Sequence, residues 1–385
     1  MNIINKISST LQYMRKALCS PFRGVGGLLL LAAFTASAGV KVVEKGSDNP
    51  VIFAFVTDAN GKAIGNTDNS GFLPAFALGS DTVVLHHMRY KPVTVAIADL
   101  ADGRIELEPI NLPKPNAITP GDQLLESVFV RSYLFDVDGL ISFTTGTMHF
   151  LIDKKSSKVT SFIDEALSCY SPSRIENCRW TMGTAVNKNI APMPKYYQTL
   201  SDKQIAELYK VVKNGNRNDL YTKSQPAWVG CTITDSAQNI ITRSMDFYQL
   251  DRIYGNVSLM KQINDTCLRY ISMSFNVEEF ENVASAIVTT DDNGNRRPLM
   301  TQVSQLKRTH GRDNPDSTPK RVVTEIYYVD VRALSNKEAS DFAKQHDKMP
   351  VEPPSWVQPI NPVLQQHIDH LTPVKYERPV EKQFF

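Results

Sequence analysis

Seven short apolar segments within about seventy residues constrain the fold of this chain most strongly. They are rich in β-branched residues, and turn-forming runs such as residues 58–61 (DANG) and 68–71 (DNSG) separate them. The expected strands are residues 40–43, 51–57, 63–67, 72–76, 81–87, 93–97 and 105–108. Strands this short, at this spacing, are typical of a Greek-key β-sandwich.

Several steps of this region match a known module. They are residues 50–56 (PVIFAFV), 67–72 (TDNSGF), 81–85 (DTVVL) and 90–92 (YKP). The region resembles the carboxypeptidase regulatory-like domain, a transthyretin-like β-sandwich of Gram-negative envelope proteins. A glycine usually precedes the tyrosine in that family, and Arg89 stands here instead. The resemblance covers about a fifth of the chain and implies a fold and an accessory role, because none of the matched residues is a catalytic group.

The first 38 residues have the organisation of a signal peptide. Their charged residues are all basic, residues 24–34 are apolar, and residues 36–38 (ASA) form a small-x-small cleavage site. The alternative is a membrane anchor, but the apolar run is shorter than the roughly 20 residues that cross a bilayer. We therefore expect cleavage after Ala38, export to the periplasm or outer-membrane surface of a Gram-negative bacterium, and no transmembrane span in the mature chain.

Removing this segment reverses the net charge. Four of the 42 Lys and Arg residues lie in it, which leaves 38 against 40 Asp and Glu residues, a formal charge of −2. A mature surface this close to neutrality gives no electrostatic reason to expect a nucleic-acid partner.

Four cysteines remain after the leader: Cys169, Cys178, Cys231 and Cys267. In an oxidising compartment an even number predicts disulfides, with three possible pairings. Cys169 and Cys178 flank a short Ser-Pro-Ser turn, so we expect them to pair and to leave Cys231 with Cys267. Buried free thiols are the second interpretation. No spacing typical of a zinc site supports metal binding.

The rest of the chain is predicted to be an α+β domain at residues 121–385, behind a proline-rich linker at 109–120. Long apolar runs predict a large antiparallel sheet, which could curve as in the half-barrels of periplasmic lipoprotein carriers. This part resembles the β-rich region that follows the module in other secreted bacterial proteins. Capping patterns predict two or three helices, near residues 201–214, 335–346 and 361–371.

Motifs for catalysis are missing from the sequence. No His is followed three residues later by Glu, and there is no G-x-S-x-G elbow or phosphate-binding glycine loop after the leader. His86 and His87 are adjacent in an expected strand, so their rings should point to opposite faces and not chelate one ion. The sequence therefore predicts no catalytic, cofactor-binding or metal-binding residue.

These observations favour a non-catalytic envelope protein, in which the small sandwich docks or assembles and the larger domain binds a protein, glycan or lipid. One alternative is a hydrolase whose carboxylates meet only in three dimensions, since glycoside cleavage needs no local motif. The other alternative is a half-barrel carrier of an apolar ligand.

Overall fold

The computed structural model describes most of the chain after the leader. The described residues are 39–100, 102–114, 121–153, 155, 159–163, 168–170, 200–254, 261–263, 267–271, 275–292, 294, 296–311, 318–345 and 353–374. Val40–Phe385 forms one compact unit. Its described part is mostly β, with antiparallel sheets and four α-helices, which confirms the expectation of a β-rich protein. The expected signal peptide at residues 1–38, with its expected cleavage site after Ala38, lies outside the described residues.

Residues 40–108, called the module below, contain two small sheets. An antiparallel sheet has the order β3 (Ala63–Asn66), β2 (Phe55–Asp58), β4 (Thr82–His86) and β5 (Val93–Ala96). A parallel pair is formed by β1 (Lys41–Glu44) and β6 (Arg104–Leu107). Apolar residues of both sheets, including Val42, Ile105, Val56 and Leu85, pack into a single buried cluster. The short strands thus share one core, as their alternating pattern requires.

Two expected strands of the module are wrong in part. Residues 51–54 are not strand, because Phe53 has a φ of 59° and the backbone turns there. The buried Thr67 hydroxyl holds that turn, donating to the carbonyl oxygen of Val51 at 2.6 Å and accepting from the Ala54 N–H at 2.9 Å. Residues 72–76 were expected as a strand, but the chain forms the 3₁₀-helix η1 (Ala75–Gly79) instead.

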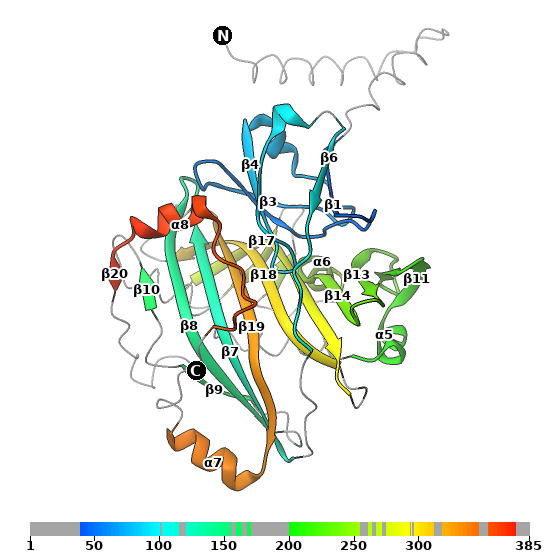
Figure 1. The fold of residues 1–385 in the computed structure, drawn as a ribbon, viewed down its shortest axis with the longest axis vertical. Helices are drawn as coiled ribbons and strands as arrows, with labels where there is room; N and C mark the ends of the chain where they lie inside the picture. Colours follow the sequence, from blue (N-terminus) through cyan, green and yellow to red (C-terminus); the bar gives the residue numbers. More distant parts are fainter. Residues whose placement is uncertain are drawn as a thin grey trace. The chain divides into compact units, whose positions relative to one another are not determined.

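A 14-stranded antiparallel sheet dominates the rest of the unit (Figure 1). Its main path runs β11 (Lys210–Asn214), β12 (Arg217–Tyr221), β13 (Trp228–Asp235), β14 (Ile240–Asp246), β17 (Phe275–Thr290), β18 (Arg296–Gly311), β19 (Lys320–Leu334), β7 (Gln123–Phe135), β8 (Leu140–Asp153), β10 (Ser168–Tyr170) and β20 (Pro373–Val374). Off this path, β9 (Val159–Ile163) pairs with β8, β15 (Lys261–Ile263) with β16, and β16 (Leu268–Ile271) with β17.

Both faces of this sheet are buried. On one face Val128, Val303 and Ile326 belong to a cluster that extends from β13 to β8. On the opposite face the neighbouring residues Phe129 and Tyr327 belong to a second cluster. Because successive side chains of a strand alternate between faces, burial on both sides explains the long, nearly continuous apolar runs in the sequence.

Four helices accompany the large sheet: α5 (Asp202–Leu208), α6 (Phe247–Tyr254), α7 (Asn336–Gln345) and α8 (Pro362–Asp369). The helices expected near residues 335–346 and 361–371 are confirmed. In Figure 1, α8 lies across the upper ends of β7 and β8, and α7 lies at the lower end of β19. No helix within the described ranges is both long and apolar enough to cross a bilayer.

The helix expected at residues 201–214 is wrong in its second half. The capping box between Ser201 and Gln204 is present, but the helix ends at Leu208 and residues 210–214 form β11. Val211 and Val212 are β-branched, and β11 pairs with β12 through a turn in which Gly215 has a φ of 61°. Helix α6 follows β14 directly, and at its start the Asp246 carboxylate accepts from the Gln249 N–H at 2.9 Å.

The two described thiols do not pair as expected. Cys231 and Cys267 are both buried, and no disulfide joins them. The sequence could not reveal this, because spacing along the chain does not determine whether two side chains approach each other. The expected pairing of Cys169 with Cys178 lies outside the described side chains.

Candidate functional site

The contact between the module and the large sheet contains several buried charged and polar side chains, among them His86, Arg89 and Glu325. We call it the module–sheet interface. On the module side, residues of β4 alternate, so that Leu85 enters the module core while His86 points out of it. Aromatic pairs join the two parts: Phe55 lies 5.1 Å from Phe135, and Phe53 lies 6.1 Å from Trp228, between ring centroids.

A buried charged cluster occupies the middle of this interface. His86 Nε2 contacts one carboxylate oxygen of Glu325, and the Tyr327 hydroxyl donates to the other at 2.8 Å. The Arg131 guanidinium lies 5.9 Å from the centre of the Tyr327 ring. Burial acts to raise the pKa of Glu325, but the charges of His86 and Arg131 and the hydrogen bonds outweigh it, and the pKa is lowered. Glu325 is therefore an ionised carboxylate inside the protein.

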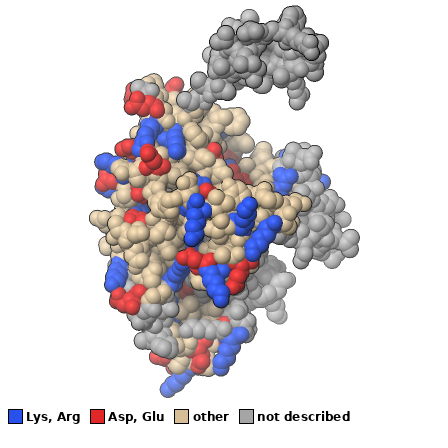
Figure 2. Space-filling model, turned by 90° about the vertical axis from the view of Figure 1, so that its right-hand side faces the viewer, with Lys and Arg blue, Asp and Glu red and all other residues tan. Residues whose placement is uncertain are grey.

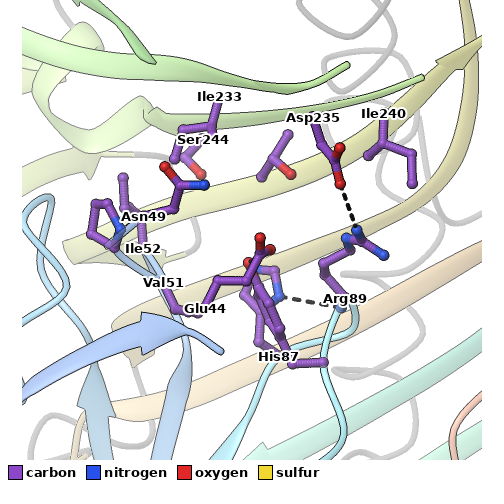
Figure 3. Close-up of a pocket in the computed structure, with 13 residues that line it drawn as sticks. Glu44, Asn49, Val51, Ile52, His87, Arg89, Ile233, Asp235, Ile240 and Ser244 are labelled. Carbon is purple, nitrogen blue, oxygen red and sulfur yellow. Dashed lines mark hydrogen bonds and ion pairs between the residues drawn. The ribbon is translucent and has the colours of Figure 1, made fainter. Parts of the chain in front are cut away.

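A small cavity also lies between the module and the large sheet, lined by His87, the neighbour of His86 in the chain (Figure 3). Its volume of about 20 Å³ is room for a single water molecule. The module contributes the loop after β1 and the residues that follow β4, and the sheet contributes β13 and β14. The residues that define the cavity chemically are Glu44, Asn49, His87, Arg89, Tyr90, Asp235, Thr242 and Ser244.

Arg89 reaches across the interface next to this cavity. Its guanidinium donates to Gln238 at 2.9 Å and to the carbonyl oxygen of Ile110 at 2.5 Å, and lies 3.5 Å from the Asp235 carboxylate. Arg89 is nearly completely buried. The resemblance leads one to expect glycine at this position. A glycine has no side chain that could make the contacts of Arg89 to Gln238 and Asp235.

His87 is a neutral side chain in this setting. Burial, together with the positive charges of His86 and Arg89, lowers its pKa to about 3. Its Nδ1 accepts from the Arg89 backbone N–H at 3.2 Å. His86 contacts Glu325 while His87 lines the cavity, in agreement with the opposite orientations expected from their adjacent positions. Within the described residues there is no group of three or more potential metal ligands.

Further polar contacts join the module to the large sheet. Asn66 donates to Glu281 and to the Ser304 hydroxyl, the latter at 3.0 Å, and Arg321 donates to Glu281 at 2.6 Å. Arg217 of β12 donates to the carbonyl oxygen of Asn69 at 2.9 Å. The Gln302 amide of β18 accepts from the Met88 N–H and donates to the Phe53 carbonyl oxygen, at 3.2 and 3.4 Å.

Two carboxylates near this interface have raised pKa values, which bears on the hydrolase alternative. Burial, with the charges of Glu281 and Glu279, raises the pKa of Asp246 to about 6. Burial also raises the pKa of Glu279. However, Glu279 forms an ion pair with Lys307 at 3.1 Å and Glu281 forms one with Arg321 at 2.6 Å. Each of the two glutamates thus forms an ion pair with a basic residue of the sheet, Lys307 or Arg321.

None of the interface residues was identified as a site from the sequence. The sequence carries two signals: Glu325 interrupts an apolar strand run (VVTEIYY), and Arg89 stands where the resemblance leads one to expect glycine. Nothing in the sequence indicates that these residues, more than 200 positions apart, lie at the same interface.

Comparisons with known proteins add little. No protein-family model matches this chain, and no curated protein matches it. A solved structure of the 12:0-ACP thioesterase from Umbellularia californica covers 54% of this chain and 76% of its own, with 14% identity and a TM-score of 0.07. A similarity this weak carries no argument about fold or activity.

Proposed function

We propose that this chain is a non-catalytic, exported envelope protein of a Gram-negative bacterium. In this proposal, residues 40–108 form a transthyretin-like β-sandwich that is permanently docked on the large sheet. The large sheet with its helices binds a protein, glycan or lipid partner. The single observation that carries the proposal is the use of buried charged side chains to attach the module.

The energetics of these charges favour a permanent attachment. Separation would leave Glu325 without His86 and would expose the apolar surfaces of Phe55 and Phe135. Leaving a buried charge such as the Glu325 carboxylate without its partner typically costs about 3–5 kcal/mol. A module held this way is a structural part of the protein, and its polar side chains are engaged in attachment.

The same contacts argue against catalysis at the interface. His87 is neutral with its Nδ1 occupied, and Arg89 has three protein partners. The neighbouring cavity has room for about one water molecule. A substrate of ordinary size would have to displace these contacts before it could enter.

Surface charge is consistent with a partner that is not strongly charged. Figure 2 shows Lys and Arg side chains interspersed with Asp and Glu over one face, without a broad field of one sign. Such a surface has little electrostatic preference for polyanions.

Two measurements test the proposal. Fractionation of cells that express the full chain should find it outside the cytoplasm, with residues 1–38 removed. A broad screen of the purified protein on peptides, glycans and esters should show no turnover. Retention in the cytoplasm with an intact leader contradicts export, and robust turnover of any substrate contradicts a non-catalytic role.

A carrier of an apolar ligand is the second candidate. One buried apolar cluster extends across strands β13 to β8, on the opposite face of the sheet from Tyr327 and Met300. Native mass spectrometry of gently purified protein separates the two candidates, since a carrier should retain a lipid and a protein- or glycan-binding scaffold should not.

A further inference from the structure

An apolar surface protrudes from the module on the turn that follows Gly71. The exposed fractions are 38% for Phe72, 85% for Phe76 and 39% for Leu78. Within the described residues only three other large apolar side chains are this exposed, and they belong to other elements: Val137, Leu208 and Val212. We call Phe72, Phe76 and Leu78 the apolar tip.

The local geometry holds these side chains outward. In the 3₁₀-helix η1 successive residues are about 120° apart. Ala77 is fully buried in the module core, so its neighbours Phe76 and Leu78 must both point away from the core. Gly71, at a φ of 83°, approaches the Val42 carbonyl so closely that a Cβ there would lie 2.6 Å from its oxygen. The turn therefore packs closely against the module, and this packing holds the side chains of Phe76 and Leu78 in their exposed positions.

The chain around the tip lacks ionisable side chains. Residues 69–80 (NSGFLPAFALGS) contain none, and the nearest on either side are Asp68 and Asp81. Residues 69–80 therefore offer no charged side chain of their own, and Asp68, whose carboxylate accepts from the Phe72 N–H at 2.8 Å, lies at the edge of the tip. Its own chemistry fits an uncharged, apolar environment.

The tip lies next to the point at which the leader joins the module. The Leu73 N–H donates to the Val40 carbonyl oxygen at 2.9 Å, and Lys41 forms an isolated β-bridge with Phe72. The leader, with its apolar residues 24–34, ends at residue 38. During export, before the expected cleavage after Ala38, a leader engaged in a bilayer would keep the apolar tip within a few residues of that bilayer.

We propose that the apolar tip contacts a phospholipid bilayer, into which Phe76 inserts. This inference rests on the proposed export of the protein and names the surface on which the exported chain lies. The available area favours a bilayer over a second copy of the chain. The three side chains expose on the order of 300 Å² together, well below the roughly 800 Å² per partner of a stable protein interface.

Vesicle flotation tests this directly. The chain from residue 39 onward, which contains the compact unit Val40–Phe385, is mixed with vesicles of phosphatidylethanolamine and phosphatidylglycerol. The protein should float with the vesicles, and Phe76→Ser should lower the partition coefficient at least about tenfold. Val137→Ser is the matched control, since Val137 is 47% exposed at a different turn, and should bind as the parent does.

Two further readouts separate insertion from other modes of association. Binding should persist in about 1 M NaCl, because charges do not drive it. Tryptophan emission from Phe76→Trp should shift to shorter wavelength with vesicles, whereas emission from Val137→Trp should not.

Several results would overturn the proposal. These are a parent protein that does not float, a Phe76→Ser variant that floats equally well, or binding that salt abolishes. A concentration-dependent dimer that Phe76→Ser abolishes would assign the tip to a second copy instead. Because flotation uses purified protein, its failure is distinguishable from a failure of export, which cell fractionation detects.

Discussion

Replacing Asp246 with asparagine should stabilise the protein at neutral pH and leave it unchanged in acid. Burial raises the pKa of this carboxyl from 3.8 to about 6, with the charges of Glu281 and Glu279 acting in the same direction. A raised pKa in the folded state means that folding favours the protonated form. Stability is therefore lost as pH rises from about 4 to about 6. The shift of about two units corresponds to about 3 kcal/mol at pH 8.

The substitution removes the charge and keeps the cap. Asparagine can still accept the hydrogen bond from the Gln249 N–H that Asp246 accepts at 2.9 Å. Urea unfolding at pH 8 should show Asp246→Asn to be more stable by up to about 3 kcal/mol. At pH 4 the two proteins should agree to within about 0.5 kcal/mol. An exposed control, Asp102→Asn, reports the background of removing a surface carboxylate. A gain that is equal at both pH values, or a loss at pH 8, would refute the reasoning.

Three other predictions concern the interface and the thiols. Glu325→Gln should lower the free energy of unfolding by about 3–5 kcal/mol in urea titrations, because it removes the buried negative charge that His86 contacts and that balances the charge of Arg131; a loss under 1 kcal/mol contradicts the buried charged cluster. The lowered pKa of Glu325 means that its ionised form stabilises the fold above about pH 4.5 and that this contribution is lost as pH falls further. The parent should therefore lose more stability than Glu325→Gln between pH 5 and 3, and parallel curves would contradict the assignment. Burial raises the pKa of Cys231 to about 12, so mass spectrometry should find its thiol unalkylated by iodoacetamide in the native protein, and rapid modification would show that it is accessible.

Strand positions could largely be predicted from the sequence, since each strand carries its own apolar pattern. The errors arose where a distant contact overrode the local signal. The apolar run at 51–57 is broken because the Thr67 hydroxyl holds Ala54 and Val51 in a turn. Residues 210–214 were expected to be helical, because valines at these positions can form one apolar face of a helix or of a strand. Pairing with β12 decides for the strand.

The module–sheet interface could not be predicted in this way. Glu325 and His86 are each a single polar residue in a strand, and a solvated or a paired role fits the sequence equally well. Only the register of β19 beside β7 and the placement of β4 bring them together. Arg89 was noticed as a departure from the family pattern, but its partners Gln238 and Asp235 lie in a turn nearly 150 residues away.

We expect the module and the large sheet to unfold as one unit. Native-state hydrogen exchange measured by mass spectrometry tests it most directly, because it reports the opening free energy of each segment. Peptides covering β2 and β4 should exchange with the same opening free energy and the same urea dependence as those covering β17 and β19. Exchange of β2 and β4 through a separate, lower-energy opening while β17 and β19 stay protected would show that the module is an independent domain.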